Sequence, residues 1–254
     1  MLNDILTLDI YRFFLIFTRI GAALMIVPGL GGSLVPTRMR LIFALAISLV
    51  LLPVLGSGLP PLPARLSNLF FLIGSEAMIG LYLGILTQTL MSTLHVAGTF
   101  IGFQVGLTNA FSYDAVAEQQ SSTLTAFFTN TALIAIFVTN LHHLMIEAIA
   151  GSYAVMVPGQ PLPLGDFAET LSKLLSSSFN FALQLSAPLL AFGIIYNVAL
   201  GLMSRLSPQI QVFFIALPLQ VLAGLWMMMV ALPLIIILFL RWFQDGLMPF
   251  LTPR

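Results

Sequence analysis

Long apolar segments with almost no charge are the feature that most constrains this chain. Of its 254 residues, 59% are hydrophobic and 7% are charged, whereas a soluble globular domain carries roughly 25% charged residues. Nine basic and nine acidic side chains are too few to cover a soluble protein of this length, so lipid or apolar partner subunits must surround it. The charge balance argues against a nucleic-acid surface, and the absence of cysteine excludes disulfides. We therefore predict an all-α, polytopic integral membrane protein.

Apolar segments as long as a membrane span recur along the chain. About 20 apolar residues in a helix cross the hydrocarbon core. We predict six such helices, and a shorter glycine-rich one at 96–110, so that six to seven long helices form one domain, residues 1–254. The six segments are Ile10–Leu30, Met39–Leu55, Leu66–Leu94, Leu124–Ala150, Ser176–Met203 and Ile210–Phe243. Residues 66–110 fit one bent helix or a hairpin, and the longest loop is predicted at 157–172. We expect the first segment to be retained rather than cleaved as a signal peptide.

Arg12 and Arg19 lie within the first apolar segment, and Glu76 lies in the middle of the third. A charged side chain in lipid is costly, so such residues normally face protein or water and mark functional sites. Arg12 and Arg19 are seven residues apart, two helical turns, and can face one neighbouring helix. Two interpretations of Glu76 stay open: a buried ion pair with one of these arginines, or a group that carries protons or ions.

Glycines at four-residue spacing and internal prolines indicate close and bent helix packing. The glycines are Gly80, Gly84, Gly98, Gly102 and Gly106. Small residues at this spacing let helix backbones approach closely in an apolar medium, and we favour a packing stripe over the lining of a narrow pore. Pro188, Pro218 and Pro233 predict bends or breaks. Other helices or subunits should cover those bends.

Motifs of common enzyme classes are missing from the sequence. Lys173 is the only lysine and lies in no Gly-Lys-Ser/Thr loop, and neither Gly-x-Ser-x-Gly nor His-Glu-x-x-His occurs. His143 and Glu147 would share one helix face and are read either as a metal or proton site or as a polar helix end. We predict no catalytic residue, no cofactor and no metal.

Three stretches of unusual residues follow one another in a characteristic order. They are Arg19-Ile-Gly21 with Pro28, Pro36 and Arg38; Glu76-x-x-x-Gly80-x-x-x-Gly84 followed by Ala97-Gly98-x-x-x-Gly102-x-Gln104-x-Gly106; and Gly201-x-x-Ser204-Arg205-x-x-Pro208-Gln209-Ile210-Gln211-Val212-Phe213. His143, Ser152, Pro158, Pro188, Asn197 and Pro218 keep the same order. Over nearly its whole length the sequence resembles the FliR family of flagellar biosynthesis proteins, whose injectisome counterpart is the SctT (SpaR/YscT) family. Ala115 and Gln211 depart from the Pro and Asn that the family commonly has there.

The resemblance implies a core subunit of the type III export gate. It implies a helical hetero-oligomer with FliP- and FliQ-like subunits, further partners similar to FlhA and FlhB, and unfolded export substrates. The expected location is the bacterial inner membrane, in contact with lipid, at the flagellar basal body. In this family a loop plugs the pore, and it corresponds here to Phe111–Ser122. The plug residues implied are Phe111, Ser112, Tyr113, Asp114 and Glu118, and the family motif residues are Ser204, Arg205, Pro208, Gln209 and Phe213.

Other functions compete with a flagellar export gate. An injectisome subunit would share the same motifs. A secondary transporter with Glu76 as its proton carrier would predict an inverted repeat, and the sequence shows none. If the chain is only a scaffold that shapes its neighbours, residues 111–122 are an ordinary surface connection.

Overall fold

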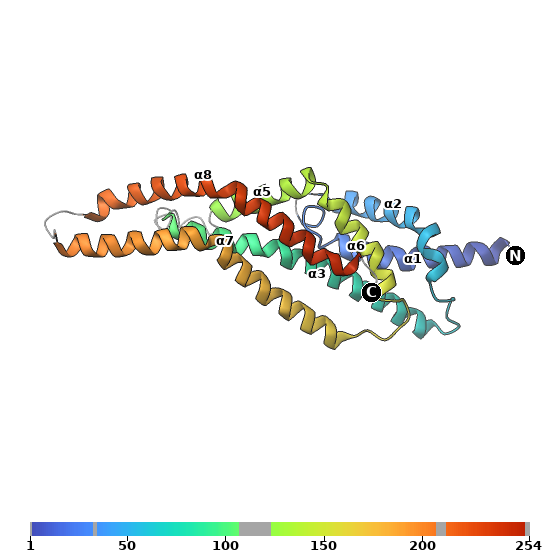
Figure 1. Ribbon diagram of the computed structural model, residues 1–254. Helices are drawn as coiled ribbons and strands as arrows, with labels where there is room; N and C mark the ends of the chain where they lie inside the picture. The colour runs from blue at the N-terminus through green and yellow to red at the C-terminus, as the bar shows by residue number, and fades with distance from the viewer. Residues whose placement is uncertain (1, 33–34, 107–122, 207–211, 252–254) are drawn as a thin grey trace. The chain divides into compact units, whose positions relative to one another are not determined.

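The computed structural model describes residues 2–32, 35–106, 123–206 and 212–251, and the regular secondary structure in these ranges is helical (Figure 1). This confirms the all-α, polytopic prediction. The α-helices are α1 (Leu2–Leu24), α2 (Thr37–Leu55), α3 (Leu66–Gln104), α5 (Thr123–Val138), α6 (Leu141–Val155), α7 (Leu164–Leu206) and α8 (Val212–Leu247). Short 3-10 turns, η1 (Gly56–Gly58) and η2 (Met248–Phe250), follow α2 and α8.

Within the described residues, four helical stretches are long and apolar enough to cross a membrane: Thr37–Gly58, Leu66–Gln104, Leu164–Leu206 and Ala216–Phe250. The pair α5 and α6 makes a fifth if the two form one broken span. In the apolar windows of the four, between 11% and 39% of the residues are buried within the chain. Most of this apolar surface therefore needs lipid or another protein to cover it. The first predicted span, now α1, is not among the four because charged residues recur along it.

Two helix ends differ from the sequence prediction. The first helix ends at Leu24 rather than near residue 30, because Pro28 has no N–H to donate and its ring clashes with the carbonyl four residues earlier. The predicted loop at 157–172 is shorter, since α7 already begins at Leu164. The first turns of α7 are polar, and Lys173 Nζ pairs with Glu169 Oε1 at 2.6 Å across one helical turn. Because these turns are not apolar, the sequence pattern predicted a loop there.

The predicted segment at 124–150 is two helices instead of one. Helix α5 ends at Val138 and α6 begins at Leu141. Asn140 between them has φ 60°, the left-handed conformation that Asn tolerates better than most residues. The break therefore lies at Asn140, between Thr139 and the two histidines His142 and His143.

Residues 66–104 form one continuous helix, α3, which excludes the hairpin for that range. Helices α7 and α8 also continue through their prolines, Pro188, Pro218 and Pro233. Both helices curve in Figure 1, as expected where a proline removes one backbone hydrogen bond. The prolines therefore bend these helices rather than break them.

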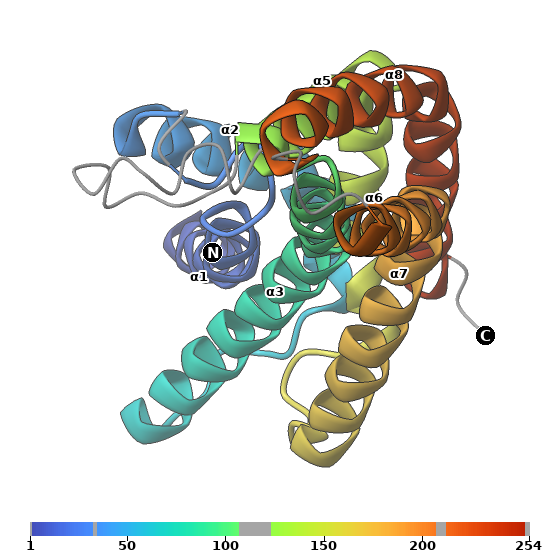
Figure 2. The same cartoon turned by 90° about the vertical axis from the view of Figure 1, so that its left-hand side faces the viewer.

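The chain divides into two compact units. Unit 1 is Met1–Leu90, Thr139–Leu174 and Phe243–Arg254, and unit 2 is Met91–Val138 and Leu175–Trp242. In unit 1, α1 and α2 pack side by side (Figure 1 and Figure 2). In unit 2, the Tyr196 hydroxyl donates to the Ala216 carbonyl at 2.6 Å and links α7 to α8. The single domain predicted for residues 1–254 stays a prediction.

Candidate functional site

A buried ion pair joins α1 to α3 in unit 1. Arg19 Nε donates to Glu76 Oε2 at 2.7 Å, and Arg19 Nη2 donates to Glu76 Oε1 at 3.0 Å. Both side chains are fully buried. Two parallel N–H···O bonds from one guanidinium to one carboxylate make the stronger, geometrically defined kind of charged pair. The structure therefore pairs Glu76 with Arg19.

The remaining donors of Arg19 tie the pair to α6. Arg19 Nη1 donates to Ser152 Oγ at 3.2 Å, and Nη2 also donates to the Met156 carbonyl at 3.0 Å. The guanidinium carbon lies 3.9 Å from the ring centroid of Tyr153, a cation–π contact. We call Arg19, Glu76, Ser152, Tyr153 and Met156 the arginine cluster. Its contacts satisfy the guanidinium on several sides, as a buried charge requires.

Glycines of α3 allow the close approach that the ion pair needs. A Cβ on Gly80, one turn after Glu76, would overlap the Arg19 carbonyl oxygen and lie 2.9 Å from Ala22 Cβ. A Cβ on Gly84 would lie 2.8 Å from Ile26 Cβ. Both distances are shorter than real Cβ contacts, so α1 and α3 pack backbone to backbone here. The geometry at these two glycines fits the predicted helix packing.

Arg12 does not take part in the arginine cluster. Its Nη1 lies 3.7 Å from Asp9 Oδ1, and its side chain is 33% exposed. The prediction of a buried charge at Arg12 is therefore not met. Arg12 and Arg19 share a face of α1, but Arg12 lies two turns nearer the start of the helix, where it pairs with a residue of its own helix.

The other glycines at four-residue spacing, Gly98, Gly102 and Gly106, lie in unit 2. A Cβ on Gly98 would lie 3.0 Å from Thr125 Cα of α5, so Gly98 also lies where two helices pack closely. Gly102 is buried. Gly106 has φ +78°, and a Cβ there would lie 3.3 Å from Gln220 Cδ. Sequence reasoning missed Gln220, although an amide inside an apolar segment was a usable signal.

Several predicted site residues fall outside the described part of the chain. All five plug residues, Phe111, Ser112, Tyr113, Asp114 and Glu118, lie in 107–122. Pro208, Gln209 and the side chain of Phe213 are also outside it. Ser204 Oγ donates to the Gly201 carbonyl at 2.9 Å, and Arg205 is exposed in the last turn of α7. A cation there favourably meets the helix dipole.

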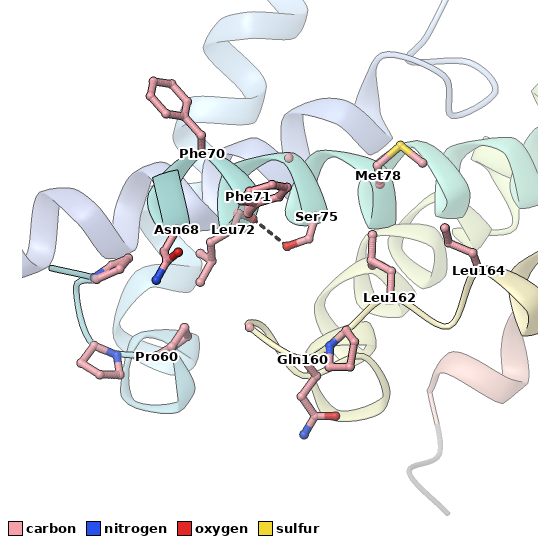
Figure 3. A pocket seen from close by; sticks show the side chains of 15 residues that line it. Pro60, Asn68, Phe70, Phe71, Leu72, Ser75, Met78, Gln160, Leu162 and Leu164 are labelled. Carbon is pink, nitrogen blue, oxygen red and sulfur yellow. Dashed lines mark hydrogen bonds between the residues drawn. The ribbon is translucent and has the colours of Figure 1, made fainter. Parts of the chain in front are cut away.

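Unit 1 also contains an open groove of about 1170 Å³. It lies between the start of α3 and the segment that leads into α7, and Figure 3 shows Phe71, Met78 and Leu162 on its walls. Ser75 Oγ donates to the Leu72 carbonyl of its own helix at 2.8 Å. None of the described residues lining the groove is charged or a histidine. The groove thus offers apolar contact rather than acid–base chemistry.

No metal site assembles among the described residues. No group of three or more His, Asp or Glu side chains comes together there. His143 and Glu147 thus gain no third ligand of this kind within the described ranges. The rings of His142 and His143 lie 4.1 Å apart between centroids.

Comparison with known proteins identifies the family. Residues 10–246 match the family described as bacterial export proteins, family 1. The chain belongs to this family. It is 35% identical to the flagellar biosynthetic protein FliR of Caulobacter vibrioides over 224 residues, 88% of this chain and 89% of that protein. It is 31% identical to FliR of Bacillus subtilis, covering 89% and 87% of the two chains, and 29% identical to FliR of Escherichia coli, covering 85% and 82%.

Residues that carried the resemblance to the export family meet in two places. Arg19, Glu76 and Ser152 belong to the arginine cluster of unit 1, with Gly80 and Gly84 beside it. Gln104 and Gly106 lie together at the end of α3 in unit 2. Residues that are far apart in the sequence thus come together in these two places.

Proposed function

We propose that this chain is a non-enzymatic subunit of the flagellar type III protein export gate. With FliP- and FliQ-like subunits it would form a gated channel for unfolded flagellar substrates. The observation that carries this proposal is the match to the export family over residues 10–246, together with relatives named as flagellar biosynthetic proteins. Those names favour flagellar over injectisome substrates.

The uncovered apolar surface supports assembly into a larger complex. In the apolar window of Ala216–Phe250, only 11% of the residues are buried within the chain. Exposed apolar surface of that extent marks protein or membrane contact. FliP- and FliQ-like subunits would cover part of it, lipid would cover the rest, and FlhA- and FlhB-like components would join the same apparatus.

The bacterial inner membrane, at the flagellar basal body, is the proposed location. The long apolar stretches support a membrane position, and the family supports the flagellar apparatus. The sequence has no nucleotide-binding loop, so the energy for export would come from the proton motive force and a separate ATPase.

The proposed plug is the segment Phe111–Ser122. Phe111 and Tyr113 are large enough to obstruct a narrow lumen, and hydrophobic constrictions can gate by excluding water. Asp114 and Glu118 would keep the segment soluble once it is displaced. This assignment rests on the family resemblance.

Double substitution of Phe111 and Tyr113 with alanine tests the gate. We expect ion leakage through the assembled complex in liposomes, because the aromatic obstruction is gone. Phe70 and Phe71, two exposed aromatics at the start of α3, provide the matched control when both become alanine. A membrane that stays as tight with the plug variant as with the control would leave only a scaffold role.

The geometry disfavours a proton-coupled transporter. Both carboxylate oxygens of Glu76 accept hydrogen bonds from Arg19. A proton carrier must exchange its proton with water, whereas Glu76 is fully buried. We therefore propose a structural role for the ion pair in unit 1.

A further inference from the structure

The last residue of α3 is held by a side chain of α8 in unit 2. Gln220 Nε2 donates to the Gln104 carbonyl oxygen at 2.9 Å. The final carbonyl groups of a helix have no partner within the helix, so this amide supplies a cap from a distant part of the sequence. Gln220 is 5% exposed. A buried amide is costly without a hydrogen bond, and this contact provides one.

Two glycines shape the space around the end of α3. A Cβ on Gly193 of α7 would collide with the side-chain amide of Gln104. A Cβ on Gly224 of α8 would lie 3.0 Å from Val105 Cγ2. Gly224 lies four residues after Gln220, so both are on one face of α8. The end of α3 therefore fits closely between α7 and α8.

The backbone changes direction at Gly106 under the same glutamine. Gly106 adopts φ +78°, the left-handed conformation that commonly ends a helix and that glycine adopts without strain. Its N–H donates to the Phe103 carbonyl at 3.2 Å. A Cβ added to Gly106 would come 3.3 Å from Gln220 Cδ, so the Gln220 side chain lies against this glycine. One side chain thus caps α3 and packs over the turn that ends it.

We propose that Gln220 is a positioning residue of the export gate: its amide fixes the direction in which the chain leaves α3 at Gly106. The residues that carry this role are Gln104, Gly106, Gly193 and Gln220, which we call the glutamine clasp. An apolar side chain would fill a buried site on α8 equally well, so packing alone does not explain an amide there. The proposal rests on the proposed function.

Gln220→Met is the direct test, because methionine keeps the length and volume but cannot donate. We expect amide hydrogen exchange at Val105 and Gly106 to rise by roughly tenfold or more, since a buried carbonyl that loses its donor is strongly disfavoured. We also expect ion leakage through the assembled complex in liposomes. Gln184→Met, at an exposed glutamine of α7 in the same unit, should change neither quantity.

Two further variants keep the test decisive if Gln220→Met does not assemble. Gln220→Asn keeps the amide but shortens the side chain by a methylene, so its donor falls short of the Gln104 carbonyl, and exchange and leakage should again rise. Gln104→Ala keeps the carbonyl acceptor and relieves the contact with Gly193. The hydrogen bond from Gln220 stays possible in this variant, so amide exchange at Val105 and Gly106 should rise less than in either Gln220 variant.

Three other results would contradict the clasp, the positioning role or the gate, respectively. Unchanged exchange at Val105 and Gly106 in both Gln220 variants would refute the clasp itself. Raised exchange in a tight complex, while the Phe111 and Tyr113 double variant leaks, would reduce Gln220 to a structural cap and leave the proposed function standing. If neither kind of variant leaks, the gate proposal fails, and the positioning role fails with it.

Discussion

The guanidinium of Arg19 and the carboxylate of Glu76 meet through two nitrogen–oxygen contacts of 2.7 and 3.0 Å, with no solvent exposure on either side chain. Removing one partner of such a pair leaves a buried charge, which costs about 3–5 kcal/mol. Replacing both partners with apolar residues of similar volume is often neutral. We therefore expect a single substitution in this pair to lower the unfolding free energy and a double apolar substitution to leave it nearly unchanged.

Glu76→Gln keeps the shape of the side chain but leaves Arg19 charged and unpaired. We expect a loss of about 3–5 kcal/mol in unfolding free energy and a matching fall in the yield of assembled complex after detergent extraction. The double variant Arg19→Met with Glu76→Leu should recover most of that yield and should export. A double variant that assembles but fails to export would revive Glu76 as a proton carrier.

Arg12→Met is the control for this experiment. Arg12 is one-third exposed and pairs with Asp9 across 3.7 Å. Exposed ion pairs contribute roughly 0–1 kcal/mol. The yield of complex should therefore stay near that of the unaltered chain.

Gly80→Ala tests the close packing of α1 against α3. The new Cβ would overlap the Arg19 carbonyl oxygen, and overpacking of this kind costs about 1–3 kcal/mol. Gly74→Ala on the same helix would place its Cβ in open space and should stabilise α3 by up to about 1 kcal/mol, the helix preference of alanine over glycine. Thermal unfolding of the purified complex measures both. Equal and small effects would mean that the glycine stripe does not set the helix separation.

The apolar pattern was sufficient to predict most helices, because a span-length apolar segment needs no partner to be recognised. The pattern failed where polar residues determine the end of a helix. The break at Asn140 lies between Thr139 and two histidines, and the first turns of α7 are polar enough to resemble a loop. Helix ends depend on such local features, which average hydropathy does not register.

The sequence placed Arg12, Arg19 and Glu76 in apolar segments but did not select the pair. Both arginines lie on the same face of α1, and only the axial position of α3 decides which one meets Glu76. The hydrogen bond from Gln220 to Gln104 joins residues 116 positions apart, and neither helix alone indicates the other. Contacts between distant segments require the packed structure.

Substitutions of Tyr153 test the ring contact of the arginine cluster without removing any of the hydrogen bonds of Arg19. Its hydroxyl is buried without a hydrogen-bond partner in the part of the chain that the structure describes, while its ring lies 3.9 Å from the Arg19 guanidinium. Tyr153→Phe should therefore be neutral or slightly stabilising. Tyr153→Leu removes the cation–π contact and should cost about 0.5–2 kcal/mol. Thermal unfolding compares the two variants, and a phenylalanine variant as unstable as the leucine variant would show that the hydroxyl matters.

Exposed apolar side chains on α8 predict where partner subunits bind. Leu222, Trp226 and Val230 follow one another at four-residue intervals, and each is more than 60% exposed, so they form a stripe on one helix face. If FliP- and FliQ-like subunits cover this stripe, Trp226→Ala removes a large aromatic contact of the kind that often costs 2 kcal/mol or more, roughly thirtyfold in affinity. Trp226→Phe keeps an aromatic ring and should retain most of the binding. Co-purification after mild detergent extraction measures the loss, and full retention of both partners by the alanine variant would assign this face to lipid.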